Sequence, residues 1–200
     1  LTLFLGCLPL FTMWGVSLLS IGHLRELTFS PSSPFARKVR IAAIELGLID
    51  KIEFTPLTVA PGQPNDEYSQ IYPLKKLPAL TLDNGQVVVD SYVIVEYLDE
   101  FAGGGKLIPA SGPTRWMVKT DHSILQGMLD SMVLCRYEQV VRPKEFYWQA
   151  WADDHRHRGW IGSARFDNAS AVLARPRVVR AVRPVAWGRQ IGIPAMNRLK

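Results

Sequence analysis

The sequence predicts an α/β domain built on a mixed four-stranded sheet, followed by an incomplete all-helical domain. Between residues 23 and 102, apolar runs of strand length alternate with amphipathic helical runs in the order β-α-β-(α)-β-β-α. The glycine triplet 103–105 then marks a flexible linker. A run of helical periodicity over residues 114–142 follows it. We therefore assign residues 23–102 to the α/β domain and residues 103–158 to the partial helical one.

The first strand, residues 23–29, leads through a turn rich in Ser and Pro into an amphipathic helix. Ser33 is suited to cap this helix and Pro34 to open it, because the first turn does not use the N–H that proline lacks. Its apolar positions recur at helical spacing: Phe35, Val39, Ala42, Ala43 and Leu46. A helix N-terminus carries free N–H groups and the positive end of the dipole, so Arg37 and Lys38 near it favour an anionic partner.

The remaining elements of this domain are, in order, a strand over 52–57, a short helix over 66–72 and strands over 79–82 and 86–90. Asn84-Gly85 between the last two strands is the strongest short signal for a hairpin. Asp90-Ser91 then caps a second amphipathic helix. The apolar face of that helix consists of Ile94, Tyr97, Leu98 and Phe101.

The net charge of +5 comes from the C-terminal part of the chain. Residues 168–200 contain six Arg, one Lys and no acidic residue, so the charge says little about the partner of the main body. Trp187 is the one aromatic residue after Phe166, which gives little support to nucleic-acid binding by base stacking. Cys7 and Cys135 do not make a disulfide framework, and a reducing, cytoplasmic location is the simpler assumption.

Residues 1–22 form an apolar leader without a charged residue. The leader would just span a bilayer, but glycines and a proline weaken it as a helix, and it lacks the basic region and cleavage site of a signal peptide. Three interpretations stay open: a membrane anchor, the remnant of a signal, and surplus sequence or an additional packed segment ahead of the domain. We prefer the third.

The segment around Ser33 resembles the first β-α unit of the cytosolic glutathione transferases of bacterial type, whose α/β domain is thioredoxin-like. In that family a Ser or Cys at the S-P-F position faces the glutathione sulfur. The resemblance therefore implies that Ser33 is catalytic and that Phe35 belongs to the glutathione site. Related thioredoxin-like proteins place the first Cys of C-x-x-C here, so the present S-P-F-A leaves no dithiol chemistry. The alternative for Ser33 is a helix cap and nothing more.

Two further motifs extend the resemblance. Leu77-Pro78 matches a proline, usually cis in the family, that follows a residue whose backbone pairs with the cysteinyl part of glutathione. Asp90-Ser91 matches the acidic-Ser pair that receives the γ-glutamyl group, and Lys76 matches a lysine common before the Leu-Pro pair. Lys75 departs from the glycine often found at its position. The alternatives are simple capping for Asp90-Ser91 and a solvated charge for Lys76.

Beyond the linker, the helical run resembles the start of the family's all-helical second domain. We interpret its apolar stripe as core packing: Met117, Leu125, Met128, Leu129, Met132, Val133, Tyr137 and Val140. Residues 144–157 form a second segment with four aromatics, Phe146, Tyr147, Trp148 and Trp151. We prefer interhelical packing for these over a border of an electrophile pocket.

The end of the chain matches the family less well. Asp153, Asp154, His155 and His157 fit no metal-ligand spacing, so we interpret them as a solvated helix face and expect no metal. From Gly159 onward, Gly and Pro interrupt every helical pattern, which predicts a basic irregular tail over 159–200.

The resemblance implies a glutathione transferase with glutathione as co-substrate, whose thiolate attacks a small hydrophobic electrophile, and it allows a homodimer. The implied catalytic residue is Ser33, and the implied glutathione-binding residues are Phe35, Lys76, Leu77, Pro78, Asp90 and Ser91. Two alternatives stay open. One is a non-catalytic thioredoxin-fold module that binds glutathione or a protein, and the other is a membrane-tethered protein led by residues 1–22.

Overall fold

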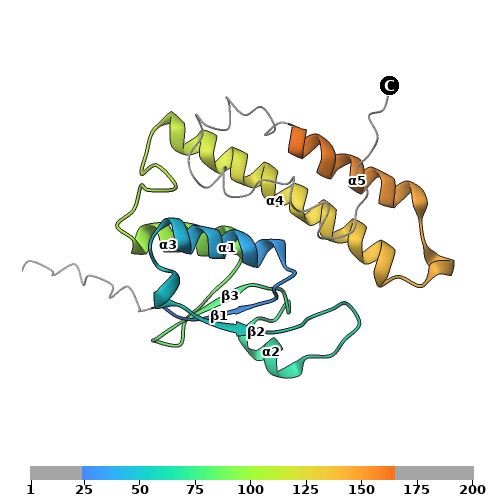
Figure 1. Cartoon of the computed structure of the whole chain (residues 1–200), viewed down its shortest axis with the longest axis horizontal. Coiled ribbons are helices and arrows are strands. Elements are labelled where there is room, and N and C mark those ends of the chain that lie inside the picture. The colour runs from blue at the N-terminus through green and yellow to red at the C-terminus, as the bar shows by residue number, and fades with distance from the viewer. Residues whose placement is uncertain (1–23, 165–200) are drawn as a thin grey trace, which may run out of the picture.

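The computed structural model describes residues 24–164 of the 200-residue chain. The predictions for the apolar leader and for the tail beyond Ala164 lie outside the described residues. Figure 1 shows a sheet covered on one face by two helices, with a helical hairpin lying above them. In the described residues, no helix has both the length and the apolar character needed to cross a bilayer.

The sheet is mixed and four-stranded, as predicted, with the strand order β2-β1-β3-β4. Its strands are β1 (Leu24–Phe29), β2 (Glu53–Pro56), β3 (Ala79–Leu82) and β4 (Val87–Val88). The central strand β1 runs parallel to β2 and antiparallel to β3, and Leu27 lies opposite both Phe54 and Leu80. Because β1 and β3 are covered from above, both Leu27 and Leu80 are fully buried.

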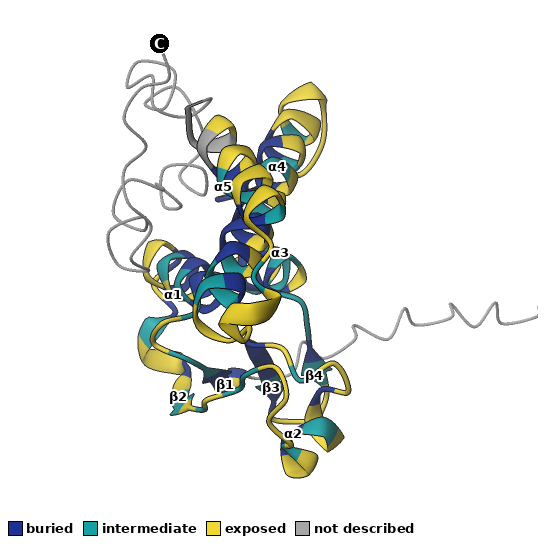
Figure 2. Ribbon diagram, turned by 90° about the vertical axis from the view of Figure 1, so that its right-hand side faces the viewer, coloured by how far each residue is buried: buried dark blue, intermediate teal, exposed yellow. Residues whose placement is uncertain are grey.

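Helices α1 (Pro34–Glu45) and α3 (Ser91–Phe101) pack side by side on one face of the sheet, and the short helix α2 (Asp66–Ile71) lies on the other side (Figure 1). A single-turn 3₁₀ helix, η1 (Ile49–Lys51), joins α1 to β2. Figure 2 shows the buried residues gathered between the sheet and the helices above it. Val39, Ile94 and Leu98 lie in this core with no exposed surface. Burial of each such side chain contributes about 1.5–3 kcal/mol.

The helical part consists of α4 (Pro113–Val140), a 3₁₀ turn η2 (Lys144–Phe146) and α5 (Gln149–Ala164). The predicted stripe on α4 is correct in its middle, where Leu125, Met128, Leu129 and Met132 are buried. It is wrong at Met117, which is 50% exposed. Two of the four aromatics in the second segment also differ from the interpretation as packing residues, because Phe146 and Trp148 are exposed, whereas Tyr147 and Trp151 are half-buried.

Helix α5 continues past the point where we expected an irregular tail. Gly159 and Gly162 both lie inside this helix, which runs to Ala164. A Cβ atom built on Gly159 would come within 2.9 Å of Cγ of Met132 on α4. The glycine therefore allows the two helices to approach closely, although in sequence it resembles a helix terminator.

The linker between the two parts is held by one buried carboxylate. Asp99, on α3, accepts hydrogen bonds from the backbone N–H groups of Lys106, Leu107 and Ile108 at 3.1, 2.8 and 3.1 Å. Leu107 and Ile108 pack into the core of the α/β domain as a result. Farther along, Arg115 and Lys119 of α4 both pair with Glu96 of α3.

We expect the substitution Asp99→Asn to lower the free energy of unfolding by about 2–4 kcal/mol, since an amide NH₂ replaces an oxygen that accepts from buried donors. Chemical denaturation of both proteins measures this difference. Asp83→Asn, in the exposed hairpin turn, is the matched control and should change stability by no more than about 0.5 kcal/mol. Equal stability of the Asp99 variant and the wild type would contradict this account of the linker.

Candidate functional site

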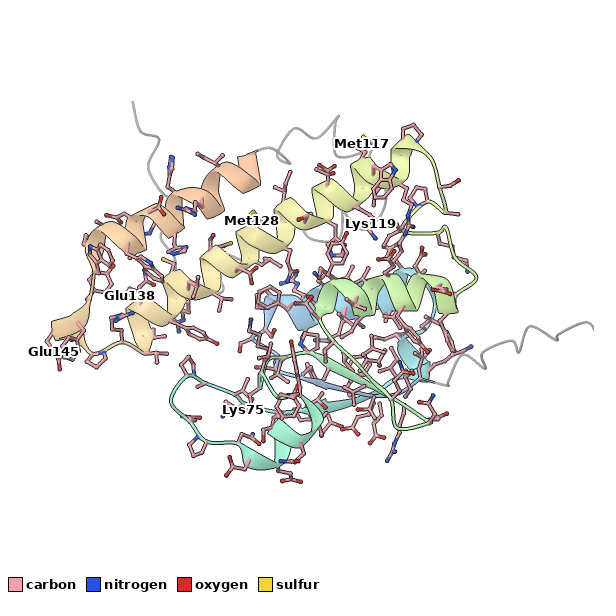
Figure 3. The ribbon with its side chains drawn as sticks, turned by 180° about the vertical axis from the view of Figure 1, so that it is seen from behind. Lys75, Met117, Lys119, Met128, Glu138 and Glu145 are labelled. Carbon is pink, nitrogen blue, oxygen red and sulfur yellow. The ribbon has the colours of Figure 1, made fainter. Side chains whose placement is uncertain are left out.

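A cleft of about 820 Å³ opens beside the N-terminal ends of α1 and α3 and the second half of α4. All of the predicted site residues line it: Ser33, Phe35, Lys76, Leu77, Pro78, Asp90 and Ser91. Figure 3 shows Lys75, another lining residue, on the loop below the second half of α4, the half that carries Glu138. The structure thus brings residues from three separate segments of the α/β domain to one cavity.

Ser33 is the N-cap of α1, and its side chain is half-buried at the cleft. Its Oγ accepts a hydrogen bond from the backbone N–H of Ala36 at 3.3 Å. A hydroxyl that accepts in this way keeps its own proton free to donate. Capping and donation to an anion in the cleft are therefore compatible, and Ser33 can do both.

The Leu77–Pro78 peptide bond is cis. Next to it, the buried Tyr68 donates from Oη to the backbone carbonyl of Lys76 at 2.7 Å, and burial raises the pKa of Tyr68 well above its usual value. Lys75 adopts a φ of 50°, a left-handed conformation that glycine favours, so the backbone keeps this geometry without the glycine. In the described part of the chain, the N–H and C=O groups of Leu77 have no hydrogen-bond partner and are available to an extended ligand.

Asp90 is the N-cap of α3, as predicted. Its Oδ1 accepts from the backbone N–H of Tyr92 at 2.6 Å and lies 3.3 Å from the hydroxyl oxygen of Ser91. The Ser91 side chain is buried at the edge of the cleft. A carboxylate, a hydroxyl and the first N–H groups of a helix therefore meet at this point, where they can hold both an ammonium and a carboxylate group.

Gln126 of α4 completes this polar cluster, and the sequence analysis missed it. Its Nε2 donates to Oδ2 of Asp90 at 3.3 Å, and its Oε1 accepts from Nζ of Lys38 at 2.6 Å. The Ser91 hydroxyl also lies 3.5 Å from that oxygen. A single amide from the helical part thus contacts side chains of both α1 and α3.

Gln126 belongs to a regularly spaced face of α4, but the spacing alone does not show that this face lines a cavity. Five residues of this helix that line the cleft follow one another at helical intervals of three or four: Gln126, Asp130, Val133, Tyr137 and Val140. The interpretation of the last three as core packing is therefore wrong, since they form a wall of the cavity. Asp130 lies near Asp90, Lys76 and Lys38, and partial burial raises the pKa of its carboxyl.

Lys38, which the sequence places near the N-terminus of α1 as a cation that favours an anionic partner, is buried. Its side chain is only 3% exposed. Burial lowers the pKa of Lys38 to about 8, and the nearby carboxylates of Asp90 and Asp130 oppose that shift. Within the described residues, the amide oxygen of Gln126 accepts a hydrogen bond from this cation.

The two aspartates in the His- and Asp-containing stretch of α5 lie on a solvated face of the helix, as we predicted. Asp153 pairs with Arg156, and Asp154 pairs with Arg158 at 2.7 Å. His155 lies against Trp151, with 4.1 Å between ring centroids. Within residues 24–164, no three His, Cys, Asp or Glu side chains gather in the manner of metal ligands.

The comparisons with known proteins agree with this geometry. The family described as glutathione S-transferase, N-terminal domain, matches residues 32–100. A glutathione transferase family member from Pseudomonas fluorescens Pf-5, solved with bound glutathione, is 32% identical; the match covers 84% of this chain and 89% of that one, with a TM-score of 0.72. The chain belongs to the glutathione transferase family.

A second structure of the same Pseudomonas fluorescens Pf-5 target and one further relative are also similar. The second structure, solved with bound S-(propanoic acid)-glutathione, is 35% identical over 82% of this chain and 80% of that one, with a TM-score of 0.70. The uncharacterized GST-like protein YibF of Escherichia coli is 27% identical over 115 residues, which are 58% of this chain. The chain spans about half the length of that curated relative, 55%.

Replacing Lys38 by Met should alter how stability depends on pH. In the wild type, the folded-state pKa is about 8 and the ordinary lysine value is 10.5, so between these values the unfolded chain binds more protons and stability rises with pH. Urea unfolding at several values from pH 7.5 to 9.5 should show the wild type gaining about 1–2 kcal/mol relative to Lys38→Met. The exposed control Lys51→Met should retain the pH dependence of the wild type, whereas parallel curves for Lys38→Met would refute this assignment.

Proposed function

We propose that this protein is an enzyme that binds glutathione in the cleft and transfers its thiolate to a small hydrophobic electrophile. The observation that carries the proposal is that the N-termini of α1 and α3 open on one cavity, with Ser33 at the first and Asp90-Ser91 at the second. Helix N-termini bind anions, and glutathione presents a thiolate and carboxylates.

The proposed catalytic residue is Ser33. Its hydroxyl would donate a hydrogen bond to the glutathione sulfur, while the dipole of α1 stabilises the negative charge. Both effects favour the thiolate over the thiol and so lower the pKa of the bound glutathione. The thiolate then forms a C–S bond with the electrophile. In a substitution the leaving group departs with the electron pair of the broken bond; in an addition the adjacent carbon gains a proton.

The other cleft residues would orient glutathione. The backbone of Leu77, turned by Pro78, would pair with the cysteinyl part, and Asp90 with Ser91 would hold the ammonium and carboxylate of the γ-glutamyl part. Lys76 offers a cation to the remaining carboxylate, and Phe35 offers an apolar wall. These roles follow from the kind of group that each residue presents to the cleft.

The electrophile would lie against α4. Val133, Tyr137 and Val140 give this side of the cleft an apolar lining suited to a small hydrophobic molecule. The Pseudomonas fluorescens relative solved with a glutathione that carries propanoic acid on sulfur supports the proposal that a substituted sulfur fits such a cleft. We further propose a cytoplasmic protein that forms a homodimer, as its family allows.

The full chain should bind immobilised glutathione and be eluted by free glutathione, because its cleft offers partners for both ends of the tripeptide. Retention on glutathione resin measures this, with a resin carrying only the linker as control. Failure of the folded protein to bind would contradict every role proposed for the cleft.

The substitution Ser33→Ala should reduce kcat for a general electrophile such as 1-chloro-2,4-dinitrobenzene by ~10²-fold, the effect of removing one preorganised donor to an anion. Its KM for glutathione should change little. Ser32→Ala, at an exposed neighbouring hydroxyl, is the matched control, and Ser33→Thr, which keeps a hydroxyl, should recover part of the activity.

Two results would separate the alternatives. Glutathione binding without conjugation by the wild type would favour a non-catalytic binding module. Full activity of Ser33→Ala would show that another group stabilises the thiolate.

A further inference from the structure

One cation on α4 has no role in the glutathione site as proposed above. Arg136 lines the cleft and is half-buried, yet within the described residues it makes no hydrogen bond and no ion pair. The four other arginines in the described residues of the helical part each pair with a carboxylate: Arg115, Arg142, Arg156 and Arg158. Arg136 therefore differs from these four arginines in having no carboxylate partner within the described residues.

The sequence of α4 leaves Arg136 without an acidic neighbour. Residues three and four positions away on a helix are close enough to pair, and at those distances stand Met132, Val133, Gln139 and Val140. None of the four carries a charge. The guanidinium thus lies at the edge of the apolar wall that Val133 and Val140 help to form.

The remaining charges of the cleft lie elsewhere or already have partners. Gln126, which contacts Asp90, precedes Arg136 by ten residues, about 15 Å along the helix axis. Asp130 lies close enough to Lys76 for the lysine to lower its pKa, which opposes the upward effect of burial. Lys75 is on the loop opposite α4 (Figure 3). Arg136 is consequently the cation that α4 itself presents beside the apolar lining.

We propose that Arg136 binds a carboxylate on the electrophile, so that the preferred second substrate is a small acid with an apolar body. A guanidinium recognises a carboxylate through two parallel N–H···O bonds, and such a bond is strengthened where apolar side chains exclude water. The apolar body would rest on Val133, Tyr137 and Val140. This inference rests on the proposed transferase function and names the substrate class of the same cleft.

A matched pair of aryl chlorides tests the inference. 4-Chloro-3-nitrobenzoate carries the carboxylate, and 4-chloro-3-nitrobenzamide replaces it with a neutral group of similar shape. With either, the glutathione thiolate attacks the ring carbon that bears chlorine, a C–S bond forms, and chloride leaves with the pair of the broken C–Cl bond. The carboxylate forms and breaks no bond, so the difference in KM between the wild type and a variant for the same probe reports how that group is bound.

Arg136→Met, which keeps much of the aliphatic stem and removes the charge, should raise KM for the benzoate by about 10-fold, the loss expected for a charge-assisted pair. Its kcat/KM for the benzamide and its KM for glutathione should stay within about 2-fold of wild type. Arg136→Lys should fall between the two proteins with the benzoate. Arg158→Met, outside the cleft, is the control and should match the wild type with both probes.

Three outcomes would overturn the inference, and they differ from one another. An equal loss with both probes would show that Arg136 has no preference for an acid. A rise confined to KM for glutathione would assign Arg136 to a carboxylate of glutathione itself. Conjugation of neither probe by the wild type would contradict the proposed function, and this inference with it.

Discussion

The Asp99 carboxylate determines where the helical part begins relative to the sheet. It accepts from the N–H groups of residues 106–108 and so fixes the linker against α3 at the point where the chain leaves the α/β domain. The ion pairs that Glu96 of α3 forms with Arg115 and Lys119 then hold the first turns of α4 against α3. Because α4 is one continuous helix, the position of its start also determines where Gln126 meets Asp90 and where the distant wall of the cleft lies. The geometry of the cleft thus depends on hydrogen bonds to Asp99, which does not itself line the cleft.

The α/β domain and its share of the cleft could be predicted from sequence because local signals specify them. Caps such as Ser33 and Asp90 and the Asn84-Gly85 hairpin each depend on residues within a few positions of one another. The β4 strand, which is two residues long instead of the expected five, shows how weakly the same signals define strand ends. Gly159 shows a second limit, since the Met132 side chain that explains it belongs to another helix.

The contribution of α4 to the site could not be read from local signals. Lys38 and Gln126 lie 88 residues apart in sequence, and nothing near either of them indicates the hydrogen bond that buries the lysine. Val133 and Tyr137 have the apolar character and spacing of core residues, and only the tertiary arrangement distinguishes a core face from a cavity wall. The environment of His122 likewise depends on a residue distant in sequence. It is fully buried, it stacks on Tyr92 of α3, and burial lowers its pKa to about 3.

The continuity of α4 also constrains how the cleft can diverge among relatives. Each residue of an α-helix turns the following ones by about 100°. An insertion or deletion of one residue between Gln126 and Val133 would therefore leave the polar cluster in place but rotate Val133, Arg136 and Tyr137 away from the cavity. Point substitutions at those three positions carry no such penalty. We therefore expect this wall of the cleft to vary among relatives through the exchange of these side chains, while the number of residues between Gln126 and Tyr137 stays constant.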